Sequence, residues 1–363
     1  MKNLFISSTT HDEGKSIVAM GLHRGLAKTV KSLGYIKPIG KASVEFAGER
    51  IDHDVALLKE GCKISAFVKD MGPVVYDGFP AAWSTPKGRE GVVEKIRAGF
   101  AKISAGKACT LIEGAGDAAA GAAFGLSSAW LAKELDAKVL LVVAGGVGRP
   151  TDEVILNKAY YEQSGVEVCG VVVNKALAEE RDRIDKWMRR VLDMMKVPLL
   201  GVIPFDVELA KGTPLHLLER FKGRVLHQEA GLGKPLGRVV IGAEHAGRVL
   251  DSLQGQVTLL CPPDRDDVLT AALAGMFLSG RKDLSIVSII LAGTAKPSDT
   301  VLRMIKRTTI PTMQVDQDVF TAASEIHAEN FKIQPGDTER IARATELVEK
   351  NVNLNELLAQ LAT

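Results

Sequence analysis

The residues best suited to chemistry lie near the N-terminus, in segment 8–16, which reads Ser-Thr-Thr-His-Asp-Glu-Gly-Lys-Ser. An apolar run precedes this segment and a helical pattern begins at Lys15, so we expect it to join a strand to a helix. Backbone N–H groups at such a helix start bind phosphate, and the helix dipole adds to them. Gly14 would allow close approach of a phosphate, Lys15 would reach the terminal phosphates, and the Ser16 hydroxyl would bind magnesium.

The pattern G-x-x-x-x-G-K-[ST] is incomplete here, because Thr9 stands where its first glycine is expected. The alternative is a polar turn followed by a helix that starts with a serine. The position directly after the first apolar run favours phosphate binding, and we predict that ATP and Mg²⁺ are bound. The loop residues expected to bind the nucleotide are Thr10, His11, Asp12, Glu13, Gly14, Lys15 and Ser16.

Apolar runs without polar alternation must position this loop. Such runs are typical of strands buried on both faces, as in a parallel sheet covered by helices. Helical patterns separate them, so we predict right-handed βαβ units and an α/β fold with a doubly wound, mostly parallel sheet. The expected strands are 4–7, 110–112, 139–143, 170–173 and 199–203.

The pattern lapses around residues 219–237, which contain several glycines and a proline. A second, smaller βα series follows, with expected strands at 239–242, 257–260, 286–291 and 312–315 and helices that include 266–279 and 338–352. We therefore predict a nucleotide-binding domain at 1–220, a linker at 221–237 and a second α/β domain at 238–353.

Segment 8–16 resembles the modified phosphate-binding loop, or P-loop, of dethiobiotin synthetase. Later landmarks of that family follow in order: its Tyr-Lys-Pro motif at 35–40, its acidic segment at 52–54, its Glu-Gly-Ala-Gly turn at 113–116 and its Gly-x-Ile-Pro turn at 201–204. The resemblance covers roughly residues 1–220. It implies that Lys37 helps to hold substrate and phosphate, that Asp54 and Glu113 contact the metal, and that Asn174 contacts the base.

These roles make chemical sense. Magnesium prefers oxygen ligands and keeps several waters, so one or two carboxylates such as Asp54 and Glu113 suffice. Lys15 and Lys37 are candidate catalytic residues, because their charges would stabilise a transferred phosphoryl group. The alternatives are that Asp54 is a helix N-cap, that Lys37 is an ordinary solvated lysine, and that Asn174 caps a strand-to-helix turn.

The expected substrate-binding residues differ from those of dethiobiotin synthetase, since Lys41 follows Gly40 where that family carries small hydroxyl residues. We therefore do not predict biotin synthesis.

Residues 238–353 resemble the DRTGG domain, through residues 240–243, 263–267, 291–294 and 316–322. In long phosphotransacetylases this module lies between a dethiobiotin-synthetase-like domain and the catalytic domain. The sequence ends at Thr363, so we expect no acetyltransferase domain.

The resemblances predict a nucleotide-sensing regulator that also takes an unknown small-molecule ligand or acceptor. One alternative is a ligase that activates a carboxylate as an acyl phosphate, as dethiobiotin synthetase and cobyrinic acid diamide synthase do. Another is a scaffold that keeps nucleotide only for stability. Both resembled families self-associate, which predicts a homodimer.

Composition narrows the setting. Lys and Arg total 46 against 44 acidic residues, so bulk charge does not favour nucleic acid or membrane partners. No apolar stretch approaches the roughly 20 residues of a membrane helix, and the N-terminus lacks a signal-peptide pattern. Four widely separated cysteines favour a reducing, cytoplasmic setting.

Overall fold

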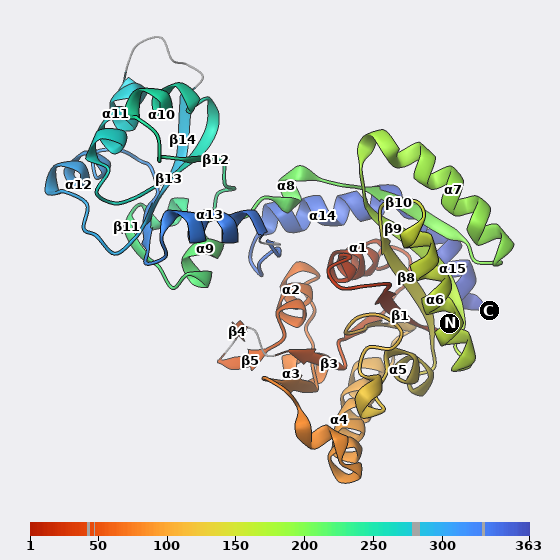
Figure 1. Cartoon of the computed structure of the whole chain (residues 1–363). Helices are drawn as coiled ribbons and strands as arrows, with labels where there is room; N and C mark the ends of the chain where they lie inside the picture. The colour runs from red at the N-terminus through yellow and green to blue at the C-terminus, as the bar shows by residue number, and fades with distance from the viewer. Residues whose placement is uncertain (42–43, 47, 278–283, 329–330) are drawn as a thin grey trace. The chain divides into compact units, whose positions relative to one another are not determined.

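The computed structural model describes residues 1–363 except 42–43, 47, 278–283 and 329–330, and it divides into two compact units (Figure 1). The first unit comprises Met1–Leu209 and Ile333–Thr363, and the second comprises Ala210–Lys332. The chain therefore leaves the first unit after Leu209 and returns to it at Ile333.

The first unit is built on a six-stranded, fully parallel sheet with the order β10-β9-β8-β1-β7-β2. All five strands expected from apolar runs are present, and residues 139–143 in the middle of β8 are fully buried, as strands covered on both faces must be. The strands are β1 (Asn3–Ser8), β2 (Leu33–Ile36), β7 (Cys109–Glu113), β8 (Ala137–Ala144), β9 (Val168–Ala176) and β10 (Leu199–Pro204).

Helices cover both faces of this sheet, and two short strand pairs lie outside it (Figure 1). The helices from the first part of the chain are α1 (Lys15–Leu26), α2 (His53–Gly61), α3 (Val68–Met71), α4 (Pro86–Ser104), α5 (Ser128–Glu134), α6 (Arg149–Gln163), α7 (Arg181–Met194) and α8 (Val207–Ala210). The short pairs are β3 (Ile39–Lys41) with β6 (Val74–Tyr76), and β4 (Val44–Phe46) with β5 (Glu49–Ile51).

The last two helices, α14 (Thr338–Asn351) and α15 (Leu354–Ala362), belong to the first unit. They are joined to it by backbone hydrogen bonds from Asn353 N to Leu200 O (2.7 Å) and from Lys2 N to Leu361 O (2.9 Å). The domain boundaries predicted from the sequence assign residues 338–353 to the second domain, whereas the structure assigns them to the first unit. An amphipathic pattern shows that a helix packs on something, but not on which sheet.

The second unit contains a five-stranded sheet with the order β11-β15-β14-β13-β12, in which only β11 is antiparallel to its neighbour. The strands are β11 (Arg224–His227), β12 (Arg238–Ile241), β13 (Gly255–Cys261), β14 (Leu284–Ala292) and β15 (Thr312–Val315). The helices are α9 (Pro214–Arg220), α10 (Ala246–Ser252), α11 (Asp266–Phe277), α12 (Asp299–Ile305) and α13 (Val319–Ala328).

One expectation needs correction in this unit. The sequence pattern predicts a linker at 221–237, but these residues include the edge strand β11, which is too short and too exposed to show a strand pattern in the sequence. The expected helix 266–279 matches α11, and its last two positions lie outside the described residues.

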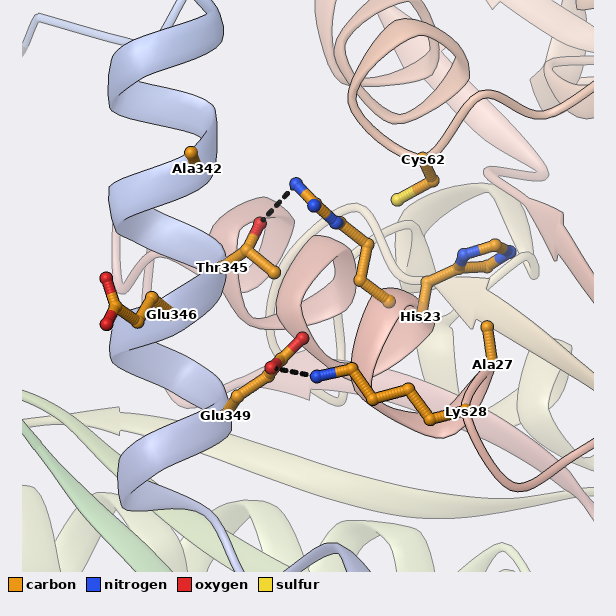
Figure 2. Close-up of a pocket in the computed structure, with 9 residues that line it drawn as sticks. His23, Ala27, Lys28, Cys62, Ala342, Thr345, Glu346 and Glu349 are labelled. Atoms are coloured by element: carbon orange, nitrogen blue, oxygen red, sulfur yellow. Dashed lines mark hydrogen bonds and ion pairs between the residues drawn. The ribbon is translucent and has the colours of Figure 1, made fainter.

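A cavity of about 380 Å³ lies between α1 and α14 (Figure 2). It is near the C-terminal end of α1, whereas the phosphate-binding loop precedes the N-terminal end, so the cavity is separate from the candidate site. Its lining residues are His23, Arg24, Ala27, Lys28, Cys62, Ala342, Thr345, Glu346 and Glu349.

Among the residues that the structure describes, no helix is long and apolar enough to cross a membrane.

Candidate functional site

The conformation and packing of the loop between β1 and α1 require glycine at position 14. Gly14 has φ 86°, in the left-handed region, and a Cβ atom there would lie 2.3 Å from Asn174 Nδ2. Asn174 lies in β9, and its Nδ2 donates a hydrogen bond to Glu13 O at 2.8 Å. Asn174, on the second strand from β1 in the sheet, thus holds the loop in place.

The loop presents a row of available backbone donors. Within the described chain, the N–H groups of residues 13–17 donate no hydrogen bond to another residue. The first helical bond of α1 runs from Val18 N to Gly14 O. Together with the positive end of the helix dipole, these donors are suited to an anion.

Two lysines lie beside the loop. Lys15 Nζ donates to Ser8 Oγ at 2.8 Å, and burial lowers the pKa of Lys15. Lys175, which follows Asn174, donates from Nζ to Asp12 O at 2.6 Å. His11 and Asp12 are exposed, whereas Glu13 is buried and its pKa is raised mainly by that burial.

Glu113, at the carboxyl end of β7, accepts hydrogen bonds on both of its oxygens. Ser16 Oγ donates to Oε1 and the Tyr35 hydroxyl donates to Oε2, each at 2.8 Å. The Glu113 side chain is 1% exposed, and burial raises its pKa. β7 and β1 are neighbours, with Ile6 paired to Glu113, which is why the carboxylate lies next to the helix that follows β1.

Lys37, two residues from Tyr35, lies among three carboxylates. Its Nζ is 2.9 Å from Asp52 Oδ1 and 3.7 Å from Glu113 Oε1, and it contacts Asp54 Oδ2. Burial by itself would lower the pKa of Lys37, but Asp54, Glu113 and Asp52 together raise it above its ordinary value. Lys37 is therefore a buried, fully paired cation and not a solvated lysine.

Asp52 and Asp54 of the acidic segment 52–54 have different structural roles. Asp52 is the N-cap of α2, because its Oδ1 accepts from Asp54 N at 2.8 Å, and its Oδ2 accepts from Lys41 N at 2.9 Å. The alternative that Asp54 is the cap is wrong, since Asp54 lies in the first turn of the helix. Asn174 likewise lies within β9 and does not cap a turn.

The structure brings Lys15, Ser16, Lys37, Asp54 and Glu113 together at the carboxyl end of the sheet. Sequence reasoning missed the contributions of Asp52, Tyr35 and Lys175. Asp52 could have been found as a capping residue before an apolar helical run. No sequence signal shows that the Tyr35 hydroxyl would reach a strand 78 residues away.

The oxygen atoms at this site are suitable ligands for magnesium. Ser16, Asp54 and Glu113 supply hydroxyl and carboxylate oxygens, which that ion prefers. Among the described residues, no three His, Cys, Asp or Glu side chains are arranged to hold a metal ion by themselves. A magnesium ion at this site would therefore complete its shell with phosphate oxygens and water.

In the second unit, the guanidinium of Arg265 is occupied by its own chain. It pairs with Asp267 at 2.8 Å and donates from Nη2 to Glu244 O at 2.8 Å.

The parallel sheet, with the loop and lysine at the start of α1, defines a P-loop NTPase domain. A family model described as an AAA domain matches residues 2–213, and a model described as a DRTGG domain matches residues 216–328. The chain belongs to this AAA-domain family, and a DRTGG domain follows the P-loop domain. Both family resemblances found in the sequence are confirmed.

Curated relatives agree. A phosphate acetyltransferase of Nitratidesulfovibrio vulgaris is 25% identical over 371 residues, which are 99% of this chain and 51% of the relative. The ATP-dependent dethiobiotin synthetase of Bacillus subtilis strain 168 is 23% identical over 222 residues, 60% of this chain and 94% of the relative. The chain thus spans about half the length of the phosphate acetyltransferases it matches.

Among solved structures, the MinC:MinD cell division protein complex of Aquifex aeolicus is similar at 17% identity, with 58% of this chain and 84% of that chain covered. The TM-score is 0.36.

Proposed function

We propose that the first unit binds ATP together with Mg²⁺. The observation that carries this proposal is a row of backbone N–H groups at residues 13–17 that donate no hydrogen bond to another described residue. They lie at a helix start, beside the ammonium of Lys15. Such a loop neutralises phosphate charge with backbone dipoles and one lysine. The relationship to an ATP-dependent dethiobiotin synthetase supports ATP as the nucleotide.

The site residues take distinct roles in this proposal. Ser16, Asp54 and Glu113 would hold magnesium, which supplies charge neutralisation at the β- and γ-phosphates. Lys15 and Lys37 would bind phosphate oxygens. Asn174 would contact the base with its side-chain amide, whose nitrogen donates one hydrogen bond to Glu13 O.

The loop backbone and side chains from Thr10 to Glu13 would enclose the phosphates. Thr10 and Glu13 already form a side-chain hydrogen bond that shapes this edge of the loop. The exposed His11 and Asp12 would lie toward the nucleotide from the solvent side.

At the level of the whole chain, we propose a nucleotide-sensing regulator in which the DRTGG unit receives or transmits the signal. The DRTGG unit is inserted between β10 and α14 of the P-loop unit, so two chain connections join it to that unit. We further propose a cytoplasmic homodimer that binds neither nucleic acid nor membrane. The four free cysteines support a reducing setting, and light scattering tests the dimer.

Calorimetric titration with Mg-ATP tests the site. The intact chain is expected to bind, and Lys15→Ala is expected to bind about 10- to 100-fold more weakly, because a charge-assisted hydrogen bond contributes roughly 1.5–3 kcal/mol. Lys133→Ala, at an exposed position of α5, is the matched control and should bind like the intact chain. Absence of binding by the intact chain would end the proposal.

Hydrolysis assays then separate the candidate functions. Slow hydrolysis that small carboxylic acids do not change would support the regulator. Strong stimulation by one carboxylic acid would support a carboxylate-activating ligase instead. Unfolding when nucleotide is removed would support a scaffold that uses nucleotide only for stability.

A further inference from the structure

Lys37 occupies the place where the proposed metal ligands converge. Its ammonium contacts or approaches Asp52, Asp54 and Glu113, and all four side chains are buried, with 7%, 6%, 8% and 1% of the surface of these residues exposed. Exposed ion pairs contribute little because water and salt screen them, whereas burial reduces that screening in this cluster.

The charges at this centre are unequal. Three carboxylates surround one ammonium, so the cluster has an excess of negative charge that a second cation can reduce. Two of those carboxylates, Asp54 and Glu113, are also the proposed ligands of magnesium. A divalent cation cannot take them while the ammonium of Lys37 remains between them, because the two cations would repel each other at contact distance.

We propose that Lys37 is a placeholder cation. In the metal-free protein it holds Asp54 and Glu113 in position, and it gives them up when a divalent cation binds. Its ammonium then turns to the phosphates of the nucleotide. This inference rests on the proposed magnesium site and assigns Lys37 a positioning role in addition to phosphate binding.

The exchange couples metal to nucleotide. A divalent cation alone would displace the ammonium without providing an anion for it, in a buried site where an unpaired charge is costly. A nucleotide alone would bring phosphates toward Asp54 and Glu113 while Lys37 is still engaged. Metal and nucleotide together replace the contacts of Lys37 with Asp54 and Glu113, so the site should favour the complex of both over either one.

A purely structural ion pair would behave differently. If Lys37 only held the fold together, its removal would destabilise the chain and leave no gain in metal affinity. If Lys37 is a placeholder, its removal leaves Asp54 and Glu113 without their cation, and a divalent cation that completes its shell with water can take its place without nucleotide.

Electron paramagnetic resonance of free Mn²⁺ distinguishes these cases, with Mn²⁺ as the probe and no nucleotide present. The intact chain is expected to bind Mn²⁺ weakly, and Lys37→Met is expected to bind it at least about tenfold more tightly. Lys15→Met is the matched control: it removes one charge from the same site, but Lys15 donates to the Ser8 hydroxyl and forms no ion pair with another described residue. Lys15→Met should gain much less affinity than Lys37→Met.

Thermal unfolding provides a second readout. Mn²⁺ should raise the melting temperature of Lys37→Met but leave that of the intact chain nearly unchanged. If Lys37→Met does not fold, the double variant Lys37→Met/Asp52→Asn removes one of the three carboxylates and is measured in its place. Equal Mn²⁺ affinity in the intact chain and in the folded Lys37 variant would overturn the proposal.

The outcome is separable from that of the proposed function. Tight Mn²⁺ binding by Lys37→Met, in a protein whose intact chain binds no Mg-ATP, would support the placeholder role and reject the nucleotide site. Mg-ATP binding by the intact chain without a gain in Lys37→Met would do the reverse.

Discussion

Gly21 of α1 lies directly against Val348 of α14, so closely that a Cβ atom at Gly21 would be 2.3 Å from Val348 Cβ. Val348 is fully buried in this contact. Gly21 lies about two helical turns after Gly14 of the phosphate-binding loop. The C-terminal segment therefore packs on the same helix that presents the loop, although α14 follows the second unit in the chain (Figure 1).

We expect Gly21→Ala to destabilise the protein by about 1–3 kcal/mol, because the new methyl group must force α14 away from α1. Urea unfolding measures the loss. Gly91→Ala is the matched control: Gly91 is also inside a helix, α4, but a Cβ atom there meets nothing within 4 Å. That variant should gain roughly 0.5–1 kcal/mol from helix propensity. Equal stabilisation of both variants would contradict the contact between α1 and α14.

We expect the first unit to fold without the second when a short Gly-Ser linker replaces residues 211–331. The returning helix begins where the chain left the unit, since the guanidinium of Arg340 donates to Leu209 O at 2.5 Å. Truncation after residue 332 should instead prevent stable folding, because it removes the buried side chains Val348, Leu357 and Leu361. Circular dichroism melts compare the two proteins. A cooperative melt of the truncated chain would show that α14 and α15 are dispensable.

The sequence predicted the sheet because its strands are short, apolar and buried on both faces, as residues 139–143 illustrate. It predicted the loop because Gly14, Lys15 and Ser16 follow such a strand directly. Both predictions depend on residues that are neighbours in the sequence, and the structure contains both the strands and the loop. The position of Glu113 beside Ser16 followed from the resemblance, and the parallel pairing of β1 with β7 explains it.

The sequence could not predict features that depend on distant contacts. The apolar stripe of α14 fits either unit, and its close packing on α1 requires the glycine at position 21. The three carboxylates around Lys37 come from α2, its cap and β7, so their convergence is a property of the assembled sheet. The same holds for the Tyr35 hydroxyl, which acts on the end of a neighbouring strand.

His23, beside the cavity of Figure 2, should make stability fall as the pH drops below about 6.5. Burial, with a smaller effect of Lys107, lowers the pKa of His23 to about 4. The unfolded chain, with an ordinary pKa of about 6.5, takes up a proton in this window that the folded chain does not. Stability is therefore full above pH 6.5 and declines toward pH 4.

Urea unfolding at pH 7 and pH 5 tests this effect. The buried histidine should account for about 2 kcal/mol of the difference between the two conditions, at roughly 1.4 kcal/mol per pH unit. His23→Gln should lose that part of the pH dependence. The control His327→Gln, at an exposed position of α13, should keep it. An unchanged pH dependence in His23→Gln would mean that other groups cause the decline.

Tyr35→Phe should weaken both the fold and the binding of Mg-ATP. The Tyr35 hydroxyl is fully buried and donates to Glu113 Oε2 at 2.8 Å, and this hydrogen bond partly offsets the rise in the pKa of Glu113 that burial causes. Without it, the carboxylate loses a donor in a site closed to water, at a cost of about 1.5–3 kcal/mol. Urea unfolding and calorimetry measure the two losses.

Tyr161→Phe is the matched control for this variant. Tyr161 is also fully buried, but its hydroxyl donates to Ser7 Oγ at 2.7 Å, so its partner is neutral and is not a proposed metal ligand. We expect a smaller loss of about 1 kcal/mol and unchanged Mg-ATP affinity. Because both variants remove one buried hydroxyl, a general loosening of the core would affect them alike. Weaker Mg-ATP binding in Tyr35→Phe alone would therefore identify the hydrogen bond to Glu113 as part of the metal-nucleotide site, and equal affinities in the two variants would exclude it.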